Sequence, residues 1–306
     1  MKHLRRHLKR EQGSVTVVVA IALVAIIGLV ALGTDVGRLY LAKQRVAAAA
    51  DAAALSGAQL LPFNRQEAFR TVQDYLRKNG VRPEASTVNL NDLDRTLAVT
   101  VEETVDFTFA RVLGRDQATV LGGAVARVRP VSGYNNVVPL GVVRADWKLG
   151  DPVVLKASAN SGQLSPGNYG ALALGARGSA SYENNLRNGY TGWIRAGNWL
   201  PTETGNMAEP TRRALQARID LDPWVTYATV GKHSDRIVII PMLESFEVNG
   251  RGEVKCIGFA AFFLEAVESQ GNDKGAVHGR FLRYMLTGES DGTGSDFATY
   301  TIKLTR

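Results

Sequence analysis

The residue types that most often do chemistry are few and scattered in this chain. Its histidines are His3, His7, His233 and His278, and its one cysteine is Cys256. Zinc sites need several His, Cys or carboxylate ligands at short spacings, and the sequence has neither a His-Glu-x-x-His pattern nor a pair of cysteines. No dinucleotide-binding or P-loop glycine pattern leads from a strand into a helix. The sequence therefore predicts a protein that is not an enzyme, with no catalytic, cofactor-binding or metal-binding residue.

One short stretch near the C-terminus has the spacing of a cation site. Asp291, Thr293 and Ser295 match the Asp-x-Ser/Thr-x-Ser spacing of a metal-ion-dependent adhesion site. Such a motif needs a large α/β domain after it, and only residues 296–306 follow here. Glycine, aspartate and serine also dominate ordinary surface turns. We therefore predict a turn, not a metal site.

Three glycine-asparagine pairs occur in the second half of the chain: Gly167-Asn168, Gly197-Asn198 and Gly205-Asn206. Glycine adopts positive φ without strain and asparagine tolerates it, so the simpler interpretation is tight turns between strands. The other interpretation is that aromatic side chains on these loops form a binding surface for a partner protein or a glycan. The candidate residues for that surface are Tyr169, Tyr182, Tyr190, Trp193 and Trp199.

The segment that must anchor all of these residues is the N-terminus. Residues 13–34 contain no charged side chain. About 20 apolar residues in a helix that rises 1.5 Å per residue cross a hydrocarbon core of roughly 30 Å, so this segment is long enough to span a membrane. The preceding 12 residues carry five basic side chains and one acidic side chain. By the positive-inside rule, we expect residues 1–12 to be a cytoplasmic tail and the domains after the span to be extracytoplasmic.

A cleaved secretory signal also starts with basic residues, so it is the alternative to a retained anchor. Signal peptides have an apolar core of about 7–15 residues followed by a small-residue cleavage site. Here the apolar run is longer, and residues 43–58 continue as an alanine-rich stretch. Because alanine is the best helix former, we expect one helix over residues 13–58, in which an uncleaved signal anchor continues past the bilayer.

Small residues along this helix suggest close packing against another backbone. Gly33 and Gly37 have the Gly-x-x-x-Gly spacing that pairs membrane helices, and Ala50 and Ala54 lie on a small, apolar face further along. Simple tolerance of small residues is the alternative explanation for the two glycines. Asp35 lies between these glycines, and we interpret it as an interfacial residue that marks the exit from the membrane.

The first 60 residues resemble a known family. A basic tail, Gln12-Gly13-Ser14 and the apolar run are followed by Thr34-Asp35-Val36-Gly37-Arg38-Leu39-Tyr40 and by Ala50-Asp51-Ala52-Ala53-Ala54-Leu55-Ser56-Gly57-Ala58. This order is similar to the N-terminal region of the TadE/TadG-like proteins of Flp (Tad) pilus assembly. The resemblance implies a membrane-anchored, non-enzymatic accessory or minor-pilin-like component of a machine that builds adhesive pili. It also implies other pilus-assembly or pilin proteins as partners, beside the lipid bilayer.

The chain departs from the pilin pattern at one position. Pilin-type precursors are cut after a glycine and carry a glutamate five residues into the mature helix. Five residues after Gly13 this chain has Val18. We therefore do not expect processing between Gly13 and Ser14.

Beyond the anchor, the patterns predict an α+β protein in two parts. Residues 59–130 form a small α+β module in this interpretation, like the one that the resemblance implies, and residues 131–136 have the composition of a linker. The elements expected in the module are a helix over 66–80, strands over 87–90 and 97–101, a short helix over 107–113 and a strand over 118–128.

The second part, residues 137–306, is predicted to be a mostly β domain of the barrel or sandwich type, with one helix over 209–219. The strongest strand signals are residues 236–243 and the apolar run 254–264, which is too short for a second span and fits a strand pair or one long strand. Cys256 lies in this run, cannot form an intramolecular disulfide, and is expected to be a buried thiol.

Charge excludes one class of partner. The net charge is +7, and the first 12 residues contribute +4 of it, so +3 remains for the rest of the chain. This leaves no electrostatic footprint for nucleic acid. The leading hypothesis is therefore a single-pass membrane protein of Flp/Tad-type pilus assembly or anchoring, without a small-molecule substrate. The alternative is a membrane-tethered extracellular protein that binds a glycan or protein ligand through its aromatic Gly-Asn loops.

Overall fold

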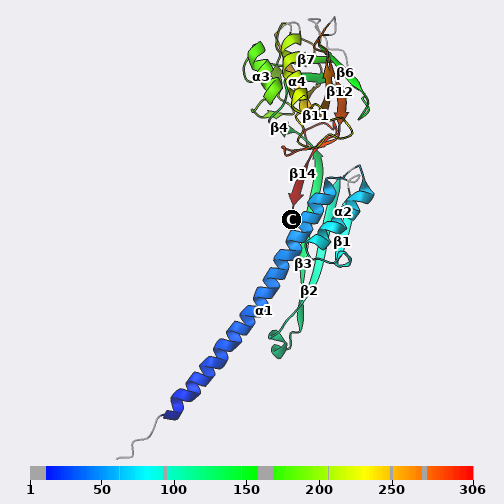
Figure 1. The fold of residues 1–306 in the computed structure, drawn as a ribbon. Helices are drawn as coiled ribbons and strands as arrows, with labels where there is room; N and C mark the ends of the chain where they lie inside the picture. The colour runs from blue at the N-terminus through cyan, green and yellow to red at the C-terminus, as the bar shows by residue number, and fades with distance from the viewer. Residues whose placement is uncertain are drawn as a thin grey trace, which may run out of the picture. The chain divides into compact units, whose positions relative to one another are not determined.

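The computed structural model describes residues 12–61, 63–91, 95–145, 147–157, 168–205, 207–248, 251–270 and 274–305. It has two compact units, one of Met1–Ala126 with Leu304–Arg306 and one of Arg127–Lys303. The boundary falls inside two strands, β3 (Gln117–Pro130) and β14 (Thr299–Thr305). The prediction of a mixed α+β protein with a long N-terminal helix and a mostly β C-terminal region is confirmed (Figure 1). Residues 1–11 of the predicted basic tail, 1–12, lie outside the described residues.

The first unit is built on helix α1 (Gln12–Ala58), which is 47 residues long and matches the predicted anchor and its alanine-rich continuation. Every described side chain from Val15 to Val30 is exposed, whereas the small side chains of the last four turns are buried. The buried set is Ala42, Val46, Ala49, Ala50, Ala53, Ala54 and Ala58. Helix α1 therefore begins with exposed apolar residues and ends with residues that are buried in the first unit.

A helix and two strands follow α1 in the first unit. Helix α2 (Arg65–Lys78) begins where the Asn64 side chain accepts the backbone N–H of Glu67 at 3.0 Å, which satisfies one of the unpaired donors of the first turn. Gly80 follows it at a φ of 74°, as a C-terminal signal requires. A 3-10 turn, η1 (Pro83–Ala85), leads into β1 (Ser86–Asn91), which pairs antiparallel with β2 (Thr96–Asp106). Residues 92–94, between these two strands, lie outside the described residues.

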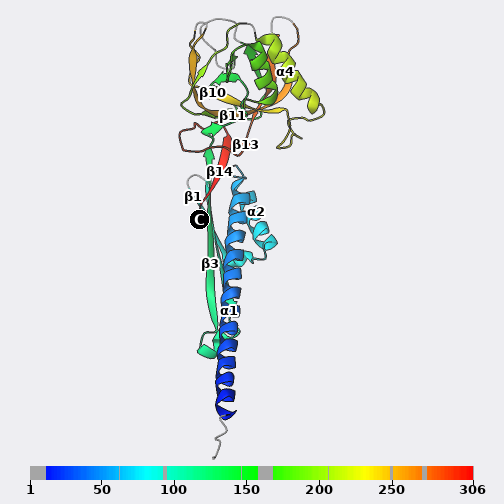
Figure 2. The same cartoon turned by 90° about the vertical axis from the view of Figure 1, so that its left-hand side faces the viewer.

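Buried and exposed residues alternate along β2 and β3, which gives each strand one apolar face. Strand β2 packs against α1, and Figure 2 shows β3 running beside α1. The buried residues of these faces are Leu97, Val99 and Val101 on β2, and Val120, Ala124 and Ala126 on β3. Gly122 is on the same face of β3, and a Cβ there would lie 2.5 Å from the backbone carbon of Val46. Strand and helix backbones therefore approach more closely than any side chain at position 122 would permit. Between β2 and β3 lies the 3-10 turn η2 (Ala110–Leu113).

The second unit is a closed sheet. Its strand order is β10-β5-β7-β6-β12-β11-β9, and β10 also pairs with β11, so six of these strands form a ring. The strands are β5 (Leu140–Val143), β6 (Val153–Ala157), β7 (Asn168–Ala171), β9 (Trp199–Pro201), β10 (Ile237–Leu243), β11 (Glu253–Val267) and β12 (Val277–Leu282). The apolar run 254–264 is thus one long strand, and the fold has the barrel form of the two that the sequence favoured.

Both faces of β11 are buried, which explains its nearly continuous apolar sequence. Ala260, Phe262 and Leu264 join a core that includes Tyr182 and Leu186 of α3 and Ala214 and Leu215 of α4, and the intervening Phe259, Ala261 and Phe263 join a second core. The helices are α3 (Ser179–Asn188) and α4 (Ala208–Leu221). The expectation of a single helix in this region is wrong, since α3 is a second one. Its sequence signal is weak, because Tyr182 and Leu186 are its only two buried residues.

Short strands complete the second unit. Strand β4 (Gly133–Tyr134) lies within the predicted linker 131–136 and pairs antiparallel with β8 (Ile194–Arg195). Strand β13 (Tyr284–Met285) pairs parallel with β14. The limits that the sequence predicts for the tail, anchor, module, linker and C-terminal domain remain predictions.

Candidate functional site

The first candidate is the uncovered half of α1. Among the described residues, α1 is the one helix that is long and apolar enough to cross a membrane, and none of its most apolar window is buried. Val24 and Leu29 are 70% and 71% exposed. A water-exposed apolar face of this length would be unfavourable, so this part of the helix requires an apolar environment.

The four predicted helix-packing residues do not share one surface. A Cβ added to Gly33 or Gly37 would meet nothing within 4 Å, so both are open to a partner. Ala50 and Ala54 are fully buried within the first unit of the same chain. Their small size serves contact with the chain's own sheet and α2, whereas Gly33 and Gly37 remain candidates for packing against another helix.

Asp35 is the most elaborately bonded residue of α1. Its carboxylate accepts three successive backbone N–H groups from the segment between β2 and β3: Thr108 at 2.9 Å, Phe109 at 2.8 Å and Ala110 at 2.7 Å. Arg38, one turn later, donates to the Thr108 hydroxyl at 2.6 Å. Asp35 is 2% exposed. It thus fastens this segment to α1 one residue after the uncharged stretch ends, a role that its position alone did not reveal.

The aromatic binding surface predicted for the second unit is only partly exposed. Tyr169 is 2% exposed and donates its hydroxyl to the Gly275 carbonyl at 3.0 Å, and burial raises the pKa of Tyr169 to about 12. Tyr182 is buried in α3, where its hydroxyl shares a hydrogen bond of 2.9 Å with that of Thr211. The placement of these two tyrosines on a binding surface is therefore wrong, because their rings are part of the core.

The remaining aromatic candidates differ in exposure. Tyr190 is half-buried, and its ring packs against the backbone of Gly192. Trp193 and Trp199 are 46% and 61% exposed, and the Arg195 guanidinium lies 5.7 Å from the centre of the Trp193 ring. Trp193 and Trp199 are thus the residues of the candidate surface that a ligand can reach. Gly167 and Asn206, which belong to two of the predicted turns, lie outside the described residues.

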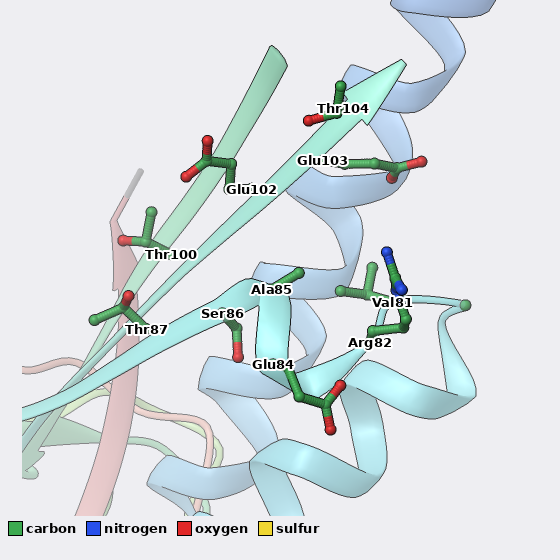
Figure 3. Close-up of a pocket in the computed structure, with 11 residues that line it drawn as sticks. Val81, Arg82, Glu84, Ala85, Ser86, Thr87, Thr100, Glu102, Glu103 and Thr104 are labelled. Atoms are coloured by element: carbon green, nitrogen blue, oxygen red, sulfur yellow. The ribbon is translucent and has the colours of Figure 1, made fainter. Parts of the chain in front are cut away.

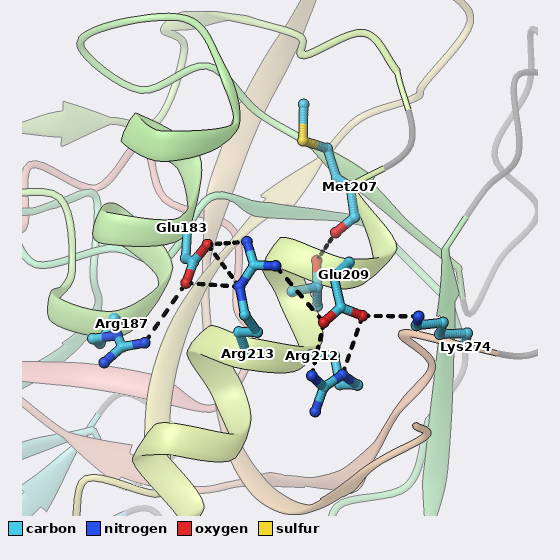
Figure 4. Close-up of polar contacts among 8 residues, drawn as sticks. Glu183, Arg187, Met207, Glu209, Arg212, Arg213 and Lys274 are labelled. Atoms are coloured by element: carbon cyan, nitrogen blue, oxygen red, sulfur yellow. Dashed lines mark hydrogen bonds and ion pairs between the residues drawn. The ribbon is translucent and has the colours of Figure 1, made fainter. Parts of the chain in front are cut away.

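A charged cluster links α3 to α4 (Figure 4). Glu209 accepts hydrogen bonds from Arg212 at 2.7 Å and forms an ion pair with Lys274 at 2.9 Å. These side-chain hydrogen bonds, first from Arg212 and then from Lys274, lower the pKa of Glu209 to about 2. Arg213 binds Glu183 of α3 at 2.6 Å. Each carboxylate is matched by guanidinium or ammonium groups, which suits a structural clamp better than proton transfer.

A polar groove of ≈ 520 Å³ lies in the first unit (Figure 3), and it is larger than a second hollow in the described part of the chain. Its lining includes Arg82, Glu84, Ser86 and Glu102, and the Ser86 hydroxyl donates to the Pro83 carbonyl at 2.6 Å. No group of three or more His, Cys, Asp or Glu residues in the described part of the chain could hold a metal ion. Among the described residues that line the groove, no nucleophilic side chain is hydrogen-bonded to a side chain that could act as its base.

The second hollow, of ≈ 380 Å³, is lined in part by Gly288, Glu289, Ser290 and Asp291. Gly288-Glu289-Ser290-Asp291-Gly292 has the Gly-x-Ser-x-Gly spacing of a nucleophile elbow. An elbow needs a strand-turn-helix context, and this segment lies between the two strands β13 and β14. The Ser290 hydroxyl is buried without a hydrogen-bond partner among the described residues, and Glu289 is paired with Arg195 at 2.6 Å. The motif therefore lacks a base for its serine.

The neighbouring residues form the turn that composition predicted. Asp291 accepts hydrogen bonds from the backbone N–H of Thr293 at 2.9 Å and from its hydroxyl at 2.6 Å. The hydroxyl bond is the main reason that the pKa of Asp291 is lowered to about 2. This is the geometry of an Asx turn.

Cys256 is buried as expected, and desolvation raises the pKa of its thiol to about 11.

Comparison with known proteins identifies the N-terminal segment. A family model described as "Putative Flp pilus-assembly TadE/G-like" matches residues 13–60, which are α1 without its first residue and the two residues after it. No curated protein and no solved structure matches the chain. The match confirms the resemblance seen in the same residues. It includes both the exposed apolar half of α1 and the half that packs against the sheet of the first unit. Over residues 13–60, the chain is thus similar to the family described as "Putative Flp pilus-assembly TadE/G-like".

Proposed function

We propose that this chain is a non-enzymatic, single-pass membrane protein that takes part in assembling or anchoring a Flp/Tad-type pilus. The observation that carries the proposal is the division of α1, whose first half is apolar and uncovered within the segment that matches the family. The basic tail stays in the cytoplasm, and both compact units are extracytoplasmic. The partners are the bilayer and other pilus-assembly or pilin proteins.

Deletion and complementation test this role. Loss of the gene reduces the number of surface pili and the adhesion of the cells, and the wild-type gene restores both. A Val24→Lys, Ile26→Lys double variant places two charges in the uncovered half of α1 and fails to restore them, because charged residues at the centre of a span oppose insertion. The matched control is Gln73→Lys on the exposed face of α2, which restores both. Unchanged pili and adhesion after deletion would reject the proposal.

Orientation needs its own measurement. Because Cys256 is buried, a cysteine placed at an exposed position is the one that reacts in the folded protein. A membrane-impermeant maleimide added to whole cells labels Gln73→Cys and does not label His7→Cys in the tail. The reverse pattern would place the two units in the cytoplasm.

The state of the N-terminus separates two roles within pilus assembly. A chain that keeps residues 1–13 and stays in the membrane fraction is an assembly or anchoring factor. A chain that starts at Ser14 and is recovered with sheared filaments is a processed minor pilin. Since Val18 replaces the glutamate of pilin precursors, we expect the first result, measured by N-terminal sequencing of both fractions.

The exposure of Trp193 and Trp199 favours a second candidate function, a membrane-tethered protein that binds a glycan or protein ligand. Exposed tryptophans are frequent anchors of binding surfaces. In a glycan and partner screen with the full chain in nanodiscs, Trp199→Ala weakens binding at least tenfold, whereas Trp224→Ala, at a tryptophan that is 92% exposed elsewhere in the second unit, does not. Equal effects of both variants, or no ligand at all, would count against this function.

A further inference from the structure

The segment that Asp35 holds ends in an apolar tip. Residues 107–116 connect β2 to β3, and within them Phe109, Val112 and Leu113 are 45%, 89% and 76% exposed. Exposed connections are usually built from glycine, proline, asparagine, aspartate and serine. Here Gly114, at a φ of 77°, already supplies the turn conformation, so the turn does not explain why its neighbours are large and apolar. These side chains have a purpose outside the fold of the unit.

The tip lies at the exit of the apolar segment, within the first unit. Ala110, which begins η2, donates its backbone N–H to Asp35, and Thr34 is the last residue of the uncharged stretch. The tip is held at both sides of its turn, since Phe107 N–H bonds the Asp116 carbonyl at 2.9 Å and Arg115 N–H bonds the Ala110 carbonyl at 3.1 Å. Three apolar side chains are thus fixed at the level where α1 leaves its apolar environment.

We propose that the tip of the β2–β3 connection is a second membrane contact, in which Phe109, Val112 and Leu113 enter the interface of the bilayer that α1 spans. This rests on the proposed function, because it requires α1 to be a membrane helix. The transfer of apolar side chains from water to the headgroup boundary is favourable, and aromatic rings are well suited to that depth.

The exposed basic residues of the tip fit the same surface. Arg111 and Arg115 flank the apolar side chains and are exposed. A guanidinium on an interfacial segment extends to the lipid phosphates while its stem stays on apolar surface. The first charged residue of α1, Asp35, stays ionised, but its carboxylate is buried and bound by three backbone N–H donors, so its charge is not presented to those phosphates. A bilayer surface of phospholipid headgroups over acyl chains is the occupant that this combination favours.

The contact has a mechanical consequence. A single helix can rotate and tilt in a bilayer, whereas a helix joined to an interfacial tip beside it has two attachment points. The first unit is therefore held in one orientation on the membrane surface, which suits a component that must present a fixed face to an assembling filament.

The experiment is a measurement of membrane depth on the full chain in liposomes of phosphatidylethanolamine and phosphatidylglycerol. A nitroxide is attached to Val112→Cys, which changes an exposed residue, and Cys256 stays unlabelled because it is buried. The same label at Val24→Cys reports the span, and at Gln73→Cys it reports α2, which packs near Gly57 at the other end of α1. Oxygen, which concentrates in lipid, and a polar nickel chelate, which stays in water, are the two relaxation agents.

We expect oxygen to relax the label more than the nickel chelate at positions 24 and 112, and the opposite at position 73. Lipid exposure at 24 together with water exposure at 112 would overturn the second contact and leave the membrane anchor standing. Water exposure at 24 would overturn both the anchor and the contact. A label at 112 that neither agent reaches would show that a second copy of the chain covers the tip, which also overturns the contact.

A second variant tests the lipid contact of the tip without disturbing the fold. Replacing Val112 and Leu113 together by asparagine removes the apolar tip at positions that contact solvent. With the label at Phe109→Cys, this change lowers the ratio of oxygen to nickel relaxation at least threefold. Replacing the exposed Thr87 of β1 by asparagine, as a control, leaves the ratio unchanged. An unchanged ratio in the double variant would show that the tip is held at its depth without any lipid contact of its own.

Discussion

The carboxylate of Asp35 in the membrane-proximal part of α1 accepts the backbone N–H of Ala110 at 2.7 Å, across 75 positions of sequence. Together with the bonds to Thr108 and Phe109, it places the connection between β2 and β3 at one level of the helix. The family match ends at residue 60, yet the partner of its first acidic residue lies far beyond that limit. The matched segment therefore positions a part of the chain that the match does not include.

Removing this carboxylate should free the tip. In Asp35→Ala the amides of Thr108, Phe109 and Ala110 lose their acceptor, and because hydrogen bonds to a charged group are worth about 1.5–3 kcal/mol, we expect their hydrogen exchange to rise at least tenfold. Hydrogen-exchange mass spectrometry of the full chain in detergent measures this. Thr34→Val is the control, since the Thr34 hydroxyl donates to the Val30 carbonyl of its own helix and not to the tip. Equal exchange in Asp35→Ala and wild type would contradict the prediction.

The contact of Gly122 with α1 should be intolerant of a methyl group. A Cβ at position 122 would lie 2.5 Å from the Val46 backbone, so Gly122→Ala must push the strand and helix apart. Overpacking of this kind costs about 1–3 kcal/mol. At the adjacent Gly123 a Cβ would come no closer than 3.9 Å, so Gly123→Ala should change the free energy of unfolding by less than about 0.5 kcal/mol. Denaturant unfolding of both variants in detergent decides, and equal stabilities would contradict the packing.

The charged cluster between α3 and α4 should make stability depend on acidic pH. The Glu209 pKa falls from 4.5 to about 2 on folding, because the native carboxylate accepts hydrogen bonds from Arg212 and Lys274. A depressed native pKa contributes stability that is complete above about pH 4.5 and is lost as the pH falls toward 2. Wild type should therefore exceed Glu209→Gln in thermal midpoint at pH 7, and the two midpoints should converge as the pH falls through that window.

The control for this measurement is Glu244→Gln. Glu244 forms one exposed ion pair, with Lys255 at 3.3 Å, and such a pair contributes little to stability. Its midpoint should follow that of wild type at every pH. A difference between wild type and Glu209→Gln that stays constant from pH 7 to pH 2 would show that the cluster acts through packing and not through charge.

The Cys256 thiol should report unfolding of the second unit. It is fully buried in β11, and desolvation raises its pKa to about 11, so little thiolate exists near pH 8. We expect the native protein to react with a maleimide more than about 100-fold more slowly than the unfolded chain does, since thiolate fraction and access both fall. Mass spectrometry after timed labelling measures the ratio. Rapid labelling under native conditions would contradict the burial of β11.

Local patterns determined much of this protein. The uncharged stretch 13–34, the alanine-rich continuation to Ala58 and the helix that ends before Gly80 follow from length, propensity and capping, which act between neighbours in sequence. The family resemblance could be read from the same residues for the same reason, because its motifs are contiguous. The buried Cys256 followed from the apolar run around it.

Only the tertiary structure decided the features that depend on distant pairing. The acceptor role of Asp35 needs donors 73 to 75 residues away, and the ring of strands closes because β10 pairs with β11 as well as with β5. Tyr169 appeared to belong to a loop, yet β7 lies between β5 and β6 and turns its ring into the core. A sequence shows which residues are apolar, whereas long-range contacts decide where each of them is buried. Ala50 is buried against the sheet and Tyr169 in the core of the second unit, but Val112 remains exposed.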